Sequence, residues 1–253
     1  MSAQTERFYD ELADAYHLIF EDWETSIDRQ AEALSAMIRE QWGDAVRRVA
    51  DVACGIGTQA LGLAALGFDV TAADSSDKAV ARARREAAQR QLTLHFHTAD
   101  MRQCQEHLGG GFDLVIACDN AVPHLLNDDD ILLALRQMHA CLRCGGGVLL
   151  SVRDYAVETK GDSTIRPYGV RDSDGRRTIA FQVWDFAGDQ YELSLFLIDD
   201  TGRPETPTTR VFRTRYYAIT TDHLCALMQE AGFTRVQRLD EGFYQPVLVG
   251  TRA

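Results

Sequence analysis

The sequence predicts an α/β fold: a doubly wound, mostly parallel seven-stranded sheet with a helical cover at the N-terminus and an antiparallel β insertion. Between residues 46 and 153, short β-branched runs alternate with helical patterns, which is typical of a parallel sheet with helices on both faces. Residues 164–219 instead carry β-rich runs separated by turn signals. Residues 1–45 repeat apolar side chains every three or four positions, which indicates helices.

The N-terminal segment, residues 1–45, is expected to form a helical lid. Phe8, Leu12 and Ala15 recur at helical spacing. A second apolar run begins at Ala31 and ends near Gly43, and glycine is a frequent residue at helix ends.

The core sheet is expected in residues 46–153 and 220–253. Its strands are predicted at residues 46–54, 69–73, 92–99, 112–118, 148–152, 234–239 and 244–251. Its helices are predicted at residues 58–66, 77–91, 129–142 and 221–231. Gly145, Gly146 and Gly147 are expected to connect the helix that ends near residue 142 with the fifth strand.

Residues 154–219 are predicted to form an antiparallel insertion between the fifth strand and the last helix. Segments 172–175, 188–189 and 199–202 are rich in Asp and Gly, as hairpin turns are. The insertion is therefore expected to be a meander rather than another strand–helix unit.

The charge balance disfavours polyanionic partners. The 253 residues contain 26 basic and 38 acidic side chains, a net charge of −12, whereas nucleic-acid-binding proteins usually carry a basic face. No apolar stretch reaches the length of a membrane span, and the N-terminus has no basic-then-apolar leader pattern. We therefore expect a cytoplasmic protein with neither a nucleic-acid nor a membrane partner.

Six cysteines are expected to be reduced thiols in that compartment. Cys141 and Cys144 have the CxxC spacing of a zinc or redox half-site, but no second pair completes a tetrahedral set. We expect this pair to be structural and the protein to bind no metal.

The most specific motif runs from Asp51 to Gly57 (DVACGIG) at the end of the first strand. Its glycines permit a tight turn and a close approach of the backbone to a ligand. Gly55-x-Gly57-x-x-Ala60 also fits the dinucleotide fingerprint, with Asp74 placed to bond ribose hydroxyls. Asp51 argues against NAD, because a carboxylate there would repel a pyrophosphate but attract a cofactor that carries an ammonium and a sulfonium.

Asp51, Gly55 and Gly57, followed by Asp74 and then by Asp100–Met101, resemble the S-adenosylmethionine site of class I methyltransferases. Further segments resemble bacterial glycine/sarcosine N-methyltransferases. These segments are FYDELA (8–13), YHLIFEDW (16–23), DNAVPHLL (119–126), SVRDY (151–155), FQVWD (181–185), RTRY (213–216) and GFYQP (242–246).

The resemblance implies a Rossmann-like core that binds S-adenosylmethionine and yields S-adenosylhomocysteine, with residues 154–219 as a substrate lid. It implies that Tyr16, Trp23 and Arg29 close over the cofactor, with Arg29 reaching its carboxylate, that Asp74 holds the ribose and that Asp100 holds the adenine amine. The implied cofactor-binding residues are Tyr16, Trp23, Arg29, Asp51, Ala53, Gly55, Gly57, Asp74, Asp100, Met101 and Asp119.

The resemblance also implies that Asn120, Arg153 and Tyr191 bind substrate, with Arg153 taking an amino-acid carboxylate. Asn120 and Arg153 follow the fourth and fifth strands, at the edge where ligands bind in open α/β sheets. Arg153 has an alternative role, a salt bridge to Asp154. His124 is also a substrate-site candidate, as a proton acceptor or as a histidine that supports the site from behind.

We therefore expect methyl transfer from S-adenosylmethionine to the amine of a small amino acid of the glycine or sarcosine type. In-line displacement at a sulfonium needs alignment and exclusion of water more than a nucleophile from the protein. The sequence singles out no catalytic acid or base. Two alternatives stay open: a methyltransferase for another small-molecule N, O or C nucleophile, and a non-catalytic binder of the cofactor.

Overall fold

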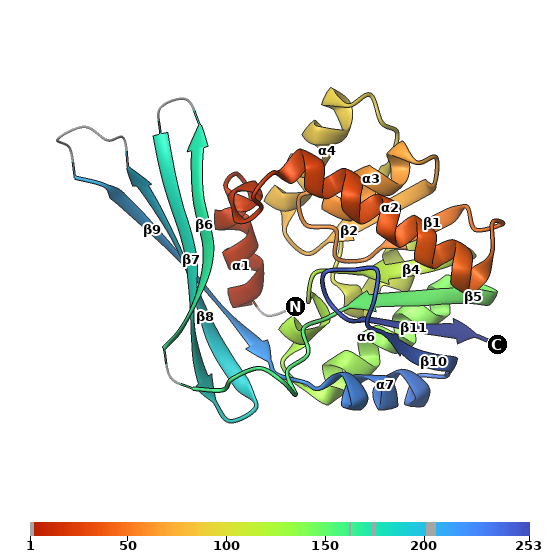
Figure 1. Cartoon of the computed structure of the whole chain (residues 1–253). Helices are drawn as coiled ribbons and strands as arrows, with labels where there is room; N and C mark the ends of the chain where they lie inside the picture. Colours follow the sequence, from red (N-terminus) through yellow and green to blue (C-terminus); the bar gives the residue numbers. More distant parts are fainter. Residues whose placement is uncertain (1–2, 162, 174–175, 201–205) are drawn as a thin grey trace.

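The computed structural model describes residues 3–161, 163–173, 176–200 and 206–253. Two sheets organise them: a seven-stranded mixed sheet and a separate four-stranded antiparallel sheet. Figure 1 shows the four-stranded sheet standing beside the core, with the first helix between the two. The predicted fold class, including the antiparallel insertion, is confirmed.

The core sheet has the strand order β10-β11-β5-β4-β1-β2-β3. Strands β3, β2, β1, β4 and β5 run parallel, and β11 runs antiparallel to both β5 and β10. The strands are β1 (Arg48–Asp51), β2 (Asp69–Asp74), β3 (His95–Thr98), β4 (Phe112–Ala117), β5 (Leu142–Ser151), β10 (Phe233–Leu239) and β11 (Val247–Arg252).

Helices cover both faces of this sheet (Figure 1). One face carries α2 (Trp23–Trp42), α3 (Thr58–Ala65) and α4 (Asp77–Gln89), and the other carries α5 (Cys104–Leu108), α6 (Asp128–Cys141) and α7 (Thr221–Glu230). Successive strand residues serve opposite faces: Val49 packs with α2 and α3, and Ala50 packs with α6 and α7. The apolar runs of the central strands are therefore buried on both sides.

The glycine run before the fifth strand is not a turn. Strand β5 begins at Leu142, and Gly145, Gly146 and Gly147 lie within it at a register shift against β4. A Cβ on Gly147 would lie 2.0 Å from the Trp42 ring. The glycines thus allow the end of α2 to pack directly on the strand, and the expected strand start at residue 148 is corrected.

The second sheet contains β6 (Thr164–Ser173), β7 (Arg176–Ala187), β8 (Gln190–Asp200) and β9 (Thr208–Tyr217) in sequential order. Its inner face packs on α1 (Ala3–Leu12) through Phe8 and Leu12. Of the expected turns, segment 188–189 joins β7 to β8. Residues 174–175 and 201–202 of the other two lie outside the described residues.

Short 3-10 helices complete the chain: η1 (Tyr16–Ile19), η2 (Met101–Gln103) and η3 (Val122–Leu125). They follow α1, β3 and β4 respectively, and η1 leads into α2. None of the described helices is long and apolar enough to cross a membrane.

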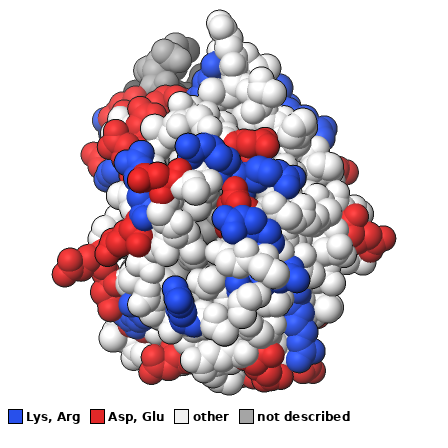
Figure 2. All heavy atoms as spheres, turned by 90° about the vertical axis from the view of Figure 1, so that its right-hand side faces the viewer, with Lys and Arg blue, Asp and Glu red and all other residues white. Residues whose placement is uncertain are grey.

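The face formed by the opening ends of the parallel strands is electrostatically mixed. Figure 2 shows basic and acidic side chains interspersed over it rather than gathered into a patch of one sign. Arg143 pairs with Asp113 at the start of β4, and Arg48 lies 3.9 Å from Asp69 at the start of β2. Among the described residues of this face, basic side chains therefore lie next to acidic ones.

The six cysteines are all free thiols. Cys141 is buried, and its sulfur lies 3.7 Å from that of Cys104, whereas Cys144 is exposed. The CxxC pair therefore does not act as a unit. Among the described residues, no group of three His, Cys, Asp or Glu side chains is arranged to hold a metal.

Candidate functional site

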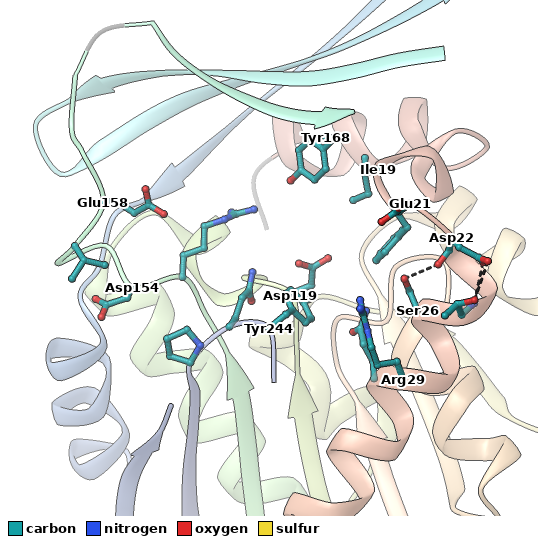
Figure 3. A pocket seen from close by; sticks show the side chains of 17 residues that line it. Ile19, Glu21, Asp22, Ser26, Arg29, Asp119, Asp154, Glu158, Tyr168 and Tyr244 are labelled. Atoms are coloured by element: carbon teal, nitrogen blue, oxygen red, sulfur yellow. Dashed lines mark hydrogen bonds between the residues drawn. The ribbon is translucent and has the colours of Figure 1, made fainter. Parts of the chain in front are cut away.

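Two cavities lie where the parallel strands end, on the side of the core that faces the second sheet. The larger has a volume of about 800 Å³ and the smaller about 30 Å³. Figure 3 shows the larger cavity, which is walled by the η1–α2 segment, by loops of the core and by the start of the insertion. Among the residues that the structure describes, Asp119 alone lines both cavities.

Part of the glycine motif, from Ala53 to Gly55, lines the smaller cavity. Gly55 and Gly57 adopt φ values of 53° and 100°, which favour glycine, and the turn leads into the first residue of α3. The Gly55 N–H donates to Asp74 Oδ2 (2.9 Å), and the Ser76 N–H donates to Asp74 Oδ1 (2.9 Å). Asp74 is thereby fixed at the end of β2, as a ribose ligand needs to be.

Behind this turn, Asp51 has a buried carboxyl oxygen that lacks a hydrogen-bond partner. The side chain is 1% exposed; Oδ1 accepts the Ala53 N–H (3.2 Å), and buried Oδ2 has no hydrogen-bond partner. Burial raises the pKa of Asp51 to about 7. A buried carboxylate oxygen without a donor is suited to a cationic group supplied by a ligand.

Asp51→Asn should therefore stabilise the ligand-free protein more at pH 8 than at pH 5. Because the folded-state pKa lies above the unfolded value of 3.8, Asp51 contributes less stability as the pH rises from about 4 to about 7, and its contribution is constant above that. We expect the difference in unfolding free energy in favour of the variant to grow by about 2 kcal/mol between these pH values. Urea unfolding at each pH measures it; a pH-independent difference would contradict this role.

A strained turn follows β4. Asp119 and Asn120 both adopt positive φ (56° and 63°), which few residues other than Gly, Asn and Asp tolerate. The Ser151 side chain accepts the Asp119 N–H (2.7 Å), and the Ser151 carbonyl accepts the Asn120 N–H (2.9 Å). Consecutive residues in this region often mark a functional site, and here the turn directs Asp119 into the cavities.

Asn120 lies behind the cavity wall rather than on it. Its Oδ1 accepts the Arg153 N–H (3.0 Å), and its Nδ2 donates to the Tyr155 hydroxyl (2.7 Å). The Tyr155 and Tyr191 hydroxyls share a hydrogen bond of 2.9 Å. Asn120 and Tyr191 are both fully buried, so in this structure they position the Arg153 backbone and do not line either cavity.

Arg153 lines the larger cavity, and one nitrogen of its guanidinium has no hydrogen-bond partner. Its charged end stacks on Trp184 at 5.1 Å and on Tyr216 at 5.7 Å, while Nη1 is buried without a hydrogen-bond partner. The alternative partner Asp154 pairs with Arg238 (2.7 Å), and Arg153 forms no salt bridge within the described part of the chain. A buried guanidinium nitrogen without an acceptor is suited to an anionic group supplied by a ligand.

His124 is held as a neutral ring. Because the Arg215 carbonyl can only accept, Nδ1 donates to it (3.1 Å), which leaves Nε2 to accept from the Tyr9 hydroxyl (2.8 Å). Burial lowers the pKa of His124 to about 3. The ring lines the smaller cavity, but both nitrogens are occupied, which favours support of the site over proton transfer.

The N-terminal residues divide into two groups. Tyr16 lines the smaller cavity and donates to Asp119 Oδ2 (3.0 Å), and Arg29 lines the larger one. Trp23 donates to the Thr58 hydroxyl (2.9 Å) and packs among α3 and α4 residues. In this structure Trp23 fastens α2 to the start of α3, and its contact with a cofactor stays a prediction.

Of the remaining predicted residues, Ala53 lines the smaller cavity. Asp100 and Met101 line neither cavity. Asp100 pairs with Arg102 (2.7 Å) and caps η2, while Met101 is buried in the core cluster beneath α6. Their predicted adenine contacts stay untested.

Several cavity residues were not singled out from the sequence: Tyr9, Glu21, Gln30, Glu158, Tyr168, Tyr244 and Gln245. Tyr9 and Tyr244 belong to segments that carry the family resemblance, which was the available signal for them. Tyr168 comes from β6, and no local pattern marks it.

Comparison with known proteins bears on this site. The family profile described as a methyltransferase domain matches residues 49–146. The glycine/sarcosine N-methyltransferase of Parasynechococcus marenigrum is 33% identical over 145 residues, which are 57% of this chain and 50% of that enzyme. The chain thus spans about half the length of the curated relatives it matches first.

Solved structures share the fold. Streptomyces venezuelae DesVI superposes with a TM-score of 0.78 at 20% identity, covering 100% of both chains. CalS10 from Micromonospora echinaspora, an amino pentose methyltransferase with bound S-adenosylmethionine, superposes with a TM-score of 0.76 at 22% identity, covering 90% of this chain and 92% of that one. Residues 49–146 thus match a methyltransferase domain, part of the chain is similar to glycine/sarcosine N-methyltransferases, and the solved structures share its fold.

Proposed function

We propose that this protein transfers a methyl group from S-adenosylmethionine to the amine nitrogen of a small amino acid of the glycine or sarcosine type. The observation that carries the proposal is Arg153, which lines the larger cavity and whose buried Nη1 has no hydrogen-bond partner in the protein. A guanidinium held by aromatic rings matches a carboxylate in both charge and planarity. Similarity to the glycine/sarcosine enzymes supports the same choice.

The residues of the smaller cavity fit the cofactor. Gly55 and Asp74 line it, and Asp74 is fixed for ribose hydroxyls. Asp51 lies behind this wall, with an unpaired buried oxygen that suits a positive charge. When bound, the cofactor supplies an activated methyl group. The protein's contribution is to hold the two ligands in line and to exclude water.

The N-terminal segment covers the cofactor-binding loops. Asp10 of α1 accepts a hydrogen bond from the Ser76 hydroxyl (2.6 Å), and Tyr9 and Tyr16 line the smaller cavity. A volume of about 30 Å³ holds only a water molecule or so, so a nucleoside requires this segment to move. This supports the predicted lid role of residues 1–45.

Incubation with labelled S-adenosylmethionine and single candidate acceptors tests the proposal. We expect label in methylated glycine or sarcosine, identified by mass, and none in acetate, which lacks the amine. Label transferred only to an amino sugar, a hydroxyl or a carbon acceptor would replace the substrate assignment. No transfer to any acceptor in a metabolite extract would favour a non-catalytic cofactor-binding protein.

A larger amine is the second candidate for the acceptor. The cavity of about 800 Å³ exceeds what a glycine-sized ligand fills, and its wall includes Glu21, Asp154 and Glu158. The amino pentose methyltransferase CalS10 shares the fold. An amino sugar in the acceptor panel separates this candidate from the amino acids.

A further inference from the structure

Among the described residues, Asp119 is the side chain at which the proposed cofactor and acceptor sides of the site meet. It lines the smaller cavity together with Gly55 and Asp74, and it lines the larger cavity together with Arg153. Figure 3 shows its carboxylate pointing up into the larger cavity, between Tyr168 and Tyr244. In an in-line transfer the methyl group and the acceptor nitrogen meet at such a junction.

The other acidic groups of the larger cavity are committed elsewhere or exposed. Glu158 pairs with Arg166, and Asp154 pairs with Arg238. Asp22 caps α2 by accepting the Thr25 N–H (3.0 Å). Glu21 is exposed at the rim.

Asp119 itself receives a hydrogen bond from Tyr16 but forms no salt bridge with a described Lys or Arg. Its carboxyl group therefore lines the cavity without an ion pair of its own, and Arg153 acts on it electrostatically. Such a group favours a cationic ligand.

We propose that Asp119 is the catalytic carboxylate that binds the acceptor as an ammonium and removes its proton. This rests on the proposed function, since it concerns the same amine. An N–H bond of the ammonium breaks, its electron pair stays on nitrogen as the lone pair that attacks, and the proton forms an O–H bond on Asp119. Arg153 and Asp119 then present opposite charges to one zwitterionic amino acid.

The surroundings of Asp119 suit this role. Burial raises the pKa of its carboxyl, which makes it a stronger base than an exposed aspartate, and Arg153 and the Tyr16 and Tyr244 hydroxyls oppose that rise. The groups coupled to it from the surrounding elements are Tyr9 (α1), Tyr16 (η1), Cys118 (after β4), Arg153 (after β5), Tyr168 (β6), Tyr216 (β9) and Tyr244 (before β11). His124, with both nitrogens bonded, does not compete for the proton.

Asp119→Asn tests the assignment with little structural change, because asparagine also tolerates the positive φ and its amide oxygen can still accept from Tyr16. We expect kcat/KM for the amine to fall about 100-fold at pH 7. The loss should shrink as the pH rises, because more of the acceptor is then neutral without help. A loss of the same size at every pH, or no loss, would overturn the proposal.

Tyr16→Phe provides a second kinetic test. The Tyr16 hydroxyl lowers the pKa of Asp119, so its removal should move the acidic limb of the kcat/KM profile to higher pH. A profile that keeps its position while the rate falls would assign Tyr16 a structural role and count against Asp119 as the titrating group.

Binding gives a measurement independent of turnover. Calorimetry with glycine and with acetate isolates the contribution of the ammonium, because acetate retains only the carboxylate. We expect Asp119→Asn to weaken glycine about tenfold or more and to leave acetate unchanged. Equal effects on both ligands would overturn the assignment. A wild-type protein that methylates no amine would refute the proposed function, whereas pH-independent loss in the variant would refute only the role of Asp119.

Discussion

Replacing Arg153 by lysine is expected to raise the KM for the amino-acid acceptor about 100-fold while changing the cofactor Kd less than threefold. The guanidinium is held flat against Trp184 and Tyr216, and its buried Nη1 has no protein acceptor. A lysine ammonium offers no planar fork and would not be oriented by the rings. Initial-rate kinetics and calorimetry with S-adenosylhomocysteine give the two constants.

Arg166→Lys is the matched control for this experiment. Arg166 stacks on the same Trp184 ring at 4.9 Å, but its guanidinium pairs with Glu158. The control therefore removes a guanidinium from the ring without removing one from the cavity lining. Equal increases in acceptor KM for both variants would mean that Arg153 acts through packing alone.

Asp74→Ala is expected to weaken cofactor binding by about 1.5–3 kcal/mol, or roughly 10- to 150-fold in Kd. The carboxyl group is buried, and burial raises its pKa. The hydrogen bonds that it accepts from the Ser76 and Gly55 backbone amides oppose this rise. Alanine removes the proposed ribose ligand and also the acceptor that fixes the glycine turn. Calorimetric titration with S-adenosylhomocysteine measures the loss.

Asp113→Ala separates binding from folding. Like Asp74, Asp113 accepts hydrogen bonds from two backbone amides, those of Arg47 and Arg48 (2.9 Å each). It lies at the start of β4, at the opposite end of the sheet from the site. The Asp113→Ala substitution should lower the free energy of unfolding without changing the cofactor Kd. An unchanged Kd in Asp74→Ala would remove Asp74 from the cofactor site.

The parts of the site that are local in sequence were predictable. The Asp51–Gly57 turn, the acid that ends β2 and the residues after β4 and β5 follow from strand periodicity and from the rule that ligands bind at the carboxyl ends of parallel strands. A side chain placed directly after a strand has its position fixed by the sheet.

Contacts between distant segments were not predictable in this way. Tyr16 bonds Asp119 across 103 positions, and Tyr191 reaches Asn120 only through Tyr155. No periodicity encodes such pairs, so the sequence does not show that Asn120 and Tyr191, which are predicted to bind substrate, lie behind the cavity wall in this structure. The glycines of β5 were expected to form a connection before the strand for the same reason. Trp42, whose ring leaves no room for a side chain at Gly147, lies about a hundred residues earlier in the sequence.

Part of the wall of the larger cavity comes from segments that do not contribute to the floor of the smaller one. The floor belongs to loops of the core sheet, whereas Glu158, Tyr168 and the η1–α2 residues come from the insertion and the N-terminus. Substitutions in these outer segments can alter which acceptor fits without touching the turn that faces the cofactor. Acceptor range can therefore diverge in evolution, or be changed by engineering, while the methyl donor stays the same.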